Sequence, residues 1–203
     1  MLLTNTILDY LNNYNFESND EFTIEGYCWD FLQEGNFGDL KFHTGATRGC
    51  FTCPDWNYVI KFDLYKKGTY CQTELRNYER AKFYRVEQVL LPIERHTILD
   101  NGIEIYFQTP YTSCYKNCPK DVAQELEKAR DAMNHTLFNR ICASMNYDIA
   151  DRWVARVVQL YGKKFLKSFQ EWRKECEVND LHRGNIGFLG NRPIILDYAG
   201  YHG

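Results

Sequence analysis

The sequence has no long hydrophobic run and no strong excess of charge of one sign. None of its apolar stretches approaches the roughly 20 residues that a membrane-spanning helix needs. The first residues lack the basic and apolar regions of a secretory leader. The formal net charge is −3, so no positive field favours nucleic acid. We therefore expect a cytoplasmic protein that binds neither a membrane nor nucleic acid.

Cysteine is plentiful, with eight residues, but its spacing gives little support for a metal site. In an intracellular protein these cysteines are expected to be reduced thiols, several of them buried. Cys50 and Cys53 have the spacing of zinc ligands, but they fall in an expected strand that a Pro-Asp turn follows. Cys114 and Cys118 have no His at ligand spacing. We do not predict a zinc site.

A stretch near the C-terminus predicts a hairpin with oxygen-bearing side chains at one edge. Gly190-Asn191 forms the turn between two short apolar strands. Asp180 and Asn185 precede the first strand, and Asp197 follows the second. Carboxylate and amide oxygens suit a hard cation such as Mg²⁺, which keeps room for substrate phosphates. The hairpin therefore predicts a cation site.

The same residues carry a resemblance to a known family. The pattern D-x-x-x-x-N, an apolar hairpin and D-Y-A-G resembles the catalytic and metal loops of the protein-kinase-like superfamily. His182 after the first Asp is more similar to the aminoglycoside-phosphotransferase branch, and the usual H-R-D is absent. The resemblance implies that Asp180 orients or deprotonates the acceptor hydroxyl, and that Asn185 and Asp197 bind Mg²⁺. A compact kinase of this kind resembles those that phages or bacteria encode.

Three short strands between residues 40 and 62 enclose a glycine loop, in the order of a kinase N-lobe. The loop has G-x-x-x-G and not the full G-x-G-x-x-G, so a plain hairpin explains it equally well. The resemblance implies that the loop approaches the phosphates of ATP, because glycine has no Cβ. The loop residues concerned are Gly45, Ala46, Thr47 and Gly49.

Lys61 lies in V-I-K, which resembles the V-A-I-K strand of kinases. It is expected to hold the α- and β-phosphates; the alternative is an edge-strand lysine that extends into solvent. Such a lysine needs an acidic partner, and the expected helix over residues 72–87 offers Glu74 and Glu79. These lie about 140° apart around a helix, so only one faces Lys61. We favour Glu74, since E-L-R-N-Y-E-R-A resembles the start of that helix in phosphotransferase-like kinases.

A second hairpin turn, Asp100-Asn101-Gly102, leads to a strand that runs into Gln108-Thr109-Pro110-Tyr111. In a kinase this is where the hinge between the lobes binds adenine, so Gln108 and Tyr111 are expected nucleotide contacts. The alternative is a strand end with a proline turn, which needs no ligand.

The longest periodic stretch, residues 148–175, predicts a core helix that is broken near Gly162. The chain continues for six residues after Asp197, whereas kinases continue with further helices. We therefore expect residues 1–34, a second copy of the chain or another partner to cover the C-lobe. The expected domains are an N-terminal helical extension (1–34), an N-lobe (35–110) and a shortened C-lobe (111–203).

The expected fold is α+β: a bilobal protein-kinase-like fold with an antiparallel five-stranded N-lobe and a reduced, mostly helical C-lobe. The expected function is transfer of the γ-phosphate of ATP, with Mg²⁺, to a hydroxyl on a protein or a small molecule. One alternative is a catalytically weak or inactive kinase-like module that binds nucleotide or a protein partner. Another is an α+β protein without a nucleotide site, in which the motif matches arise by chance.

Overall fold

The computed structural model describes residues 2–16, 24–65, 68–110, 148–181 and 185–200. The chain divides into two compact units. The first unit comprises residues 1–75 and 93–110, and the second comprises residues 76–92 and 111–203. Within the described ranges, no helix has both the length and the apolar character needed to cross a membrane.

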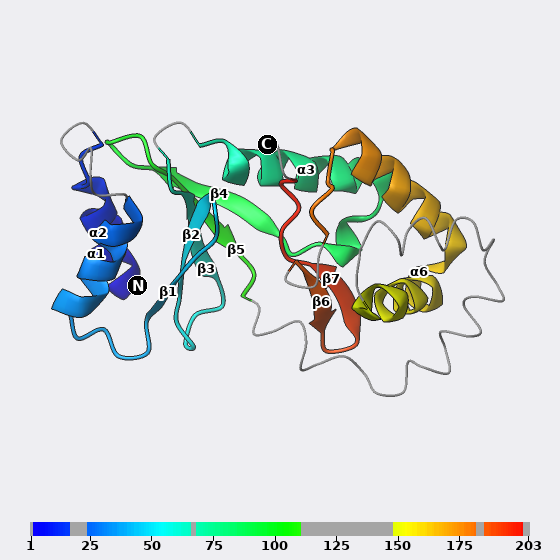
Figure 1. Ribbon diagram of the computed structural model, residues 1–203, viewed down its shortest axis with the longest axis horizontal. Coiled ribbons are helices and arrows are strands. Elements are labelled where there is room, and N and C mark those ends of the chain that lie inside the picture. The colour runs from blue at the N-terminus through cyan, green and yellow to red at the C-terminus, as the bar shows by residue number, and fades with distance from the viewer. Residues whose placement is uncertain (1, 17–23, 66–67, 111–147, 182–184, 201–203) are drawn as a thin grey trace. The chain divides into compact units, whose positions relative to one another are not determined.

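A five-stranded antiparallel sheet forms the centre of the first unit (Figure 1). Its strands lie in the order β1-β2-β3-β5-β4, so β3 is the middle strand. The predicted α+β class and the antiparallel five-stranded sheet are confirmed. The strands are β1 (Lys41–Thr44), β2 (Arg48–Thr52), β3 (Val59–Asp63), β4 (Ile93–Ile98) and β5 (Glu104–Gln108).

Two helices, α1 (Leu2–Asn12) and α2 (Ile24–Glu34), pack on one face of this sheet. Ile7 and Leu11 lie one helical turn apart on α1, as the sequence spacing predicts, and both are fully buried. They join a hydrophobic cluster with aromatic residues of the strands. The strand members of this cluster include Phe42, Phe51, Ile60 and Phe62. The apolar faces of α1 and α2 are therefore used within the first unit, and what covers the C-lobe stays a prediction.

The helix α3 (Tyr70–Tyr84) starts in the first unit and continues into the second. At its start, the Asp63 carboxylate accepts a hydrogen bond from the backbone N–H of Cys71 at 3.1 Å, which caps the helix. At its end, Arg85 has a φ of 57°, a left-handed conformation that stops the helix. The helix thus begins two residues before the predicted range and ends three residues before its end.

In the second unit, α6 (Asp148–Glu175) packs on the hairpin of β6 (Ile186–Leu189) and β7 (Arg192–Ile195). Figure 1 shows α6 as two segments that meet at an angle. The break lies at Gly162, with φ 80° and ψ 173°, as predicted. The predicted hairpin is also present, with its turn at Gly190. The buried aromatic residues described in this unit include Trp153, Phe169, Trp172, Phe188 and Tyr198.

Candidate functional site

Lys61 lies in the middle of β3, and its side chain leaves the face of the sheet opposite to the hydrophobic cluster. Its neighbours Ile60 and Phe62 belong to that cluster, and successive side chains of a strand point to opposite faces. Lys61 is only 8% exposed. Its ammonium donates to Glu74 Oε2 at 2.5 Å and to Gln108 Oε1 at 3.2 Å. The solvent-exposed alternative for this lysine is therefore wrong.

Glu74 is fully buried on α3 and accepts hydrogen bonds through both carboxylate oxygens. Oε2 accepts from Lys61 and, at 3.0 Å, from Arg48 Nη1. Oε1 accepts from Gln108 Nε2 at 3.2 Å. A buried carboxylate is tolerated only with such partners. Glu79, the other acidic candidate, is exposed and accepts from Lys82 at 2.7 Å.

Arg48 and Gln108 complete this group of four side chains, which we call the Lys61 cluster (Arg48, Lys61, Glu74, Gln108). Sequence reasoning did not predict Arg48, and it assigned Gln108 to nucleotide contact. The strand register explains how Arg48 reaches Lys61. Cys50 pairs with Lys61, and Arg48 lies two residues before Cys50, so its side chain leaves the same face of the sheet. The side chain of Gln108 hydrogen-bonds to Lys61 and Glu74 within the cluster, and its nucleotide contact stays a prediction.

The predicted glycine loop forms a tight turn between β1 and β2. The Gly45 N–H donates to the Arg48 carbonyl oxygen at 2.9 Å, and the Thr47 carbonyl accepts from the Leu64 N–H at 2.9 Å. The Ala46 carbonyl accepts from the Tyr65 hydroxyl at 3.3 Å.

Gly49 lies inside β2 and not in the turn. A Cβ atom at this position would lie 2.8 Å from the ring of Phe42 and 3.0 Å from that of Phe62. The glycine therefore leaves room for these two rings of the hydrophobic cluster, and its phosphate contact stays a prediction.

In the second unit, the β6–β7 hairpin brings Asn185 beside the segment that contains Asp197. The Leu196 N–H donates to the Asn185 carbonyl oxygen at 2.7 Å, so these two chain segments are adjacent. The Asn185 amide Nδ2 donates to the backbone oxygen of Asp180 at 2.8 Å. This bond ties Asn185 to the residue predicted as catalytic. Asp197 Oδ1 accepts from the Ala199 N–H at 3.2 Å, a short side-chain turn.

The predicted cation ligands fit the chemistry of Mg²⁺ in their donor types. The Asn185 amide nitrogen donates to Asp180, which leaves the amide oxygen Oδ1 as the atom that can bind a cation. Asp197 supplies a carboxylate, which is also a suitable ligand. Among the residues that the structure describes, no three His, Cys, Asp or Glu side chains gather as a metal site. His182, Tyr111, Cys114 and Cys118 lie outside the described residues.

Two thiols next to the Lys61 cluster stay protonated at neutral pH. Burial raises the pKa of Cys50 to about 11, although the charge of Lys61 opposes the rise. Burial raises the pKa of Cys71 well above its ordinary value. A thiol acts as a nucleophile only as the thiolate, so the geometry does not favour cysteine chemistry here.

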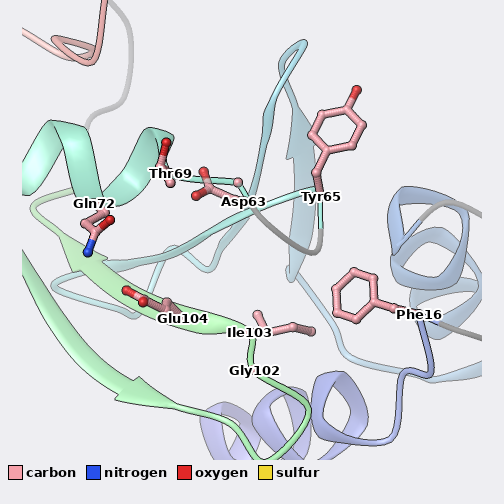
Figure 2. Close-up of a pocket in the computed structure, with 9 residues that line it drawn as sticks. Phe16, Asp63, Tyr65, Thr69, Gln72, Gly102, Ile103 and Glu104 are labelled. Carbon is pink, nitrogen blue, oxygen red and sulfur yellow. The ribbon is translucent and has the colours of Figure 1, made fainter.

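A separate pocket of about 270 Å³ lies on the first unit. Figure 2 shows Asp63, Thr69 and Gln72 on one side of it and Phe16 on the other. Its two carboxylates are bonded to the protein: Asp63 accepts from Cys71, and Glu104 accepts from the Tyr106 hydroxyl. Lys61 is not among its lining residues, so this pocket is distinct from the Lys61 cluster.

Comparison with known proteins gives no match: no family model, no curated protein and no solved structure is significantly similar to this chain.

Proposed function

We propose that this chain is an ATP-dependent phosphotransferase that moves the γ-phosphate of ATP to a hydroxyl on a protein or a small molecule. The observation that carries the proposal is the buried Lys61–Glu74 ion pair, in which the middle strand of an antiparallel sheet supplies the lysine and the following helix supplies the glutamate. The strand order β1-β2-β3-β5-β4 and the position of α3 between β3 and β4 support a protein-kinase-like fold.

The ion pair needs an explanation beyond stability. Removing two charges from water costs free energy, and a well-packed apolar pair is often as stable as a buried salt bridge. A lysine held in one geometry by Glu74 and Gln108 is suited to binding phosphate oxygens as a fixed point charge. This favours a role for Lys61 with the α- and β-phosphates.

The second unit supplies the remaining chemistry in the proposal. The Asp180 carboxylate orients the acceptor hydroxyl for in-line attack and accepts its proton. Asn185 and Asp197 hold Mg²⁺ through their side-chain oxygens. When bound, the metal neutralises charge on the phosphates. The hydrogen bond from Asn185 to Asp180 supports this assignment, because it joins the proposed metal ligand to the proposed catalytic residue.

The proposal is tested by ATP binding and by label transfer. ATP with Mg²⁺ at 100 times Kd is expected to stabilise the folded chain by about 2.7 kcal/mol in thermal unfolding. γ-Labelled ATP is expected to transfer label to an added acceptor or to the chain itself. Lys61→Met and Asp197→Asn should each weaken binding of ATP with Mg²⁺, since the proposal assigns Lys61 to the phosphates and Asp197 to the metal. Asp180→Ala should bind ATP but transfer no label.

Glu79→Gln is the matched control, because Glu79 lies on the same helix as Glu74 but is exposed and pairs with Lys82. It should bind and transfer as the wild type does. Binding of ATP by the wild type without label transfer would instead indicate the nucleotide-binding module. Absence of ATP binding would reject both functions.

A further inference from the structure

We propose that Gln108 is a positioning residue that fixes the Lys61 ammonium and the Glu74 carboxylate relative to each other. Its effect on nucleotide binding rests on the proposed function, whereas its effect on the ion pair does not. Gln108 is the last residue of β5 and is 3% exposed.

The side chain of Gln108 closes a ring of three hydrogen bonds. Its Oε1 accepts from Lys61 Nζ at 3.2 Å, and its Nε2 donates to Glu74 Oε1 at 3.2 Å. The Lys61–Glu74 bond completes the ring. Each member thus contacts both of the others, so neither charged side chain can rotate away without breaking at least two hydrogen bonds.

Only one orientation of the amide satisfies this ring. The lysine ammonium is only a donor and the ionised carboxylate is only an acceptor, so the amide oxygen must face Lys61 and the nitrogen must face Glu74. A hydrocarbon side chain of similar length cannot replace either bond. A glutamate of the same shape can face Lys61 but meets Glu74 with a second carboxylate.

The backbone of Gln108 is held on both sides, which makes it a rigid base for this task. It pairs with Val59 of β3 and with Ile93 of β4. The side chain therefore starts from a fixed point in the sheet, beside the strand that carries Lys61. A side chain anchored in this way can hold two partners that come from different elements, β3 and α3.

The first test needs no nucleotide and compares Gln108→Glu with the wild type in urea unfolding between about pH 5 and pH 8. The new carboxyl would lie against the Glu74 carboxylate, and this like charge raises the folded-state pKa of the new carboxyl, although the charge of Lys61 opposes the rise. A carboxyl with a raised folded-state pKa is tolerated while it is protonated at low pH, and the free energy of unfolding falls as the pH rises and the proton is lost. The variant should therefore approach the wild type at the acid end and fall below it at the alkaline end.

The charged groups beside the new carboxyl are Lys61, Arg48 and Glu74, and the thiols of Cys50 and Cys71 stay protonated in this range. Asp63, whose pKa burial also raises, is present in both proteins and cancels in the comparison. A variant as stable as the wild type at every pH would overturn the proposed ring.

The second test uses Gln108→Met, which keeps the length but removes both hydrogen bonds. We expect its affinity for ATP with Mg²⁺ to fall about tenfold, equivalent to one charge-assisted hydrogen bond. Its affinity for adenosine should stay unchanged, because adenosine has no phosphate for Lys61 to bind. A purely structural role would lower stability and leave the ATP affinity of the folded protein intact, and that result would overturn positioning.

The two tests separate this inference from the proposed function. If the wild type binds no ATP, the function fails, but the pH-dependent stability of Gln108→Glu still reports on the ring. If the wild type binds ATP and Gln108→Met binds it equally well, the function stands and the inference fails.

Discussion

The side-chain amide of Asn77 donates a hydrogen bond to the backbone oxygen of Tyr198 at 2.8 Å. Both residues lie in the second unit, and the bond is buried. The Asn77 carbonyl accepts in turn from the Trp172 indole at 2.9 Å, and the Tyr198 hydroxyl donates to the Leu91 carbonyl at 2.5 Å. These bonds fix the backbone next to Asp197, the proposed metal ligand.

Replacement of Asn77 by alanine should therefore destabilise the second unit. The Tyr198 carbonyl would lose the buried hydrogen bond that the Asn77 amide donates, which costs about 1–3 kcal/mol. Urea unfolding measures the loss. Glu79→Gln, an exposed change two residues along the same helix, should stay close to the wild type. Equal stability of Asn77→Ala and this control would contradict the assigned contact.

Within the Lys61 cluster, loss of the anion should cost more than loss of one cation. Glu74 Oε2 accepts from both Lys61 and Arg48, so Glu74→Ala deprives the buried Lys61 and the partly buried Arg48 of this partner. We expect a loss of about 3–5 kcal/mol. Lys61→Met should cost less, since Glu74 retains Arg48. The free energies of unfolding from urea titrations decide the order, and the reverse order would show that Arg48 does not share the carboxylate.

The break in α6 depends on a glycine. Gly162 has φ 80° and ψ 173°, a conformation that an L-residue with a Cβ reaches only with strain. Gly162→Ala should cost about 1–3 kcal/mol. Gly45→Ala is the matched control for stability, because Gly45 lacks a positive φ and has no atom within 4 Å of an added Cβ. Similar unfolding midpoints for the two variants would contradict the role of Gly162.

The Cys50 thiol should make stability depend on alkaline pH. Burial raises its pKa from 9.0 to about 11. Between these values the folded chain keeps the proton that the unfolded chain has lost, so this contribution is full at low pH and is lost as the pH rises through about 11. Stability of the wild type minus that of Cys50→Ala should therefore fall across this range in urea unfolding. A constant difference would show that the thiol ionises as readily in the fold as in the open chain.

Local pattern was enough to predict much of the fold. The Gly-Asn and Asn-Gly turns predicted two hairpins, and Gly162 predicted the break in α6. Each of these features depends on residues that are close together in the sequence, where periodicity and turn chemistry act directly.

The rest depends on contacts between distant segments. Arg48 and Gln108 reach the Lys61 cluster only because β2 and β5 flank β3 in a particular register. A shift of one residue would turn both side chains to the other face. Asn77 was likewise not predicted, because its partner in the chain lies 121 residues away. The choice of Glu74 over Glu79 came from a resemblance and agrees with the contacts observed.

The helices α1 and α2 determine where this chain can be shortened. A version that starts at residue 35 would uncover Phe42, Phe51 and Phe62 together and present a broad aromatic surface to water. An exposed aromatic surface of this kind promotes aggregation. A fragment that contains the sheet but lacks α1 and α2 is therefore expected to aggregate during purification. Crystallisation trials or fusion proteins should therefore keep α1 and α2 attached to the strands that they shield.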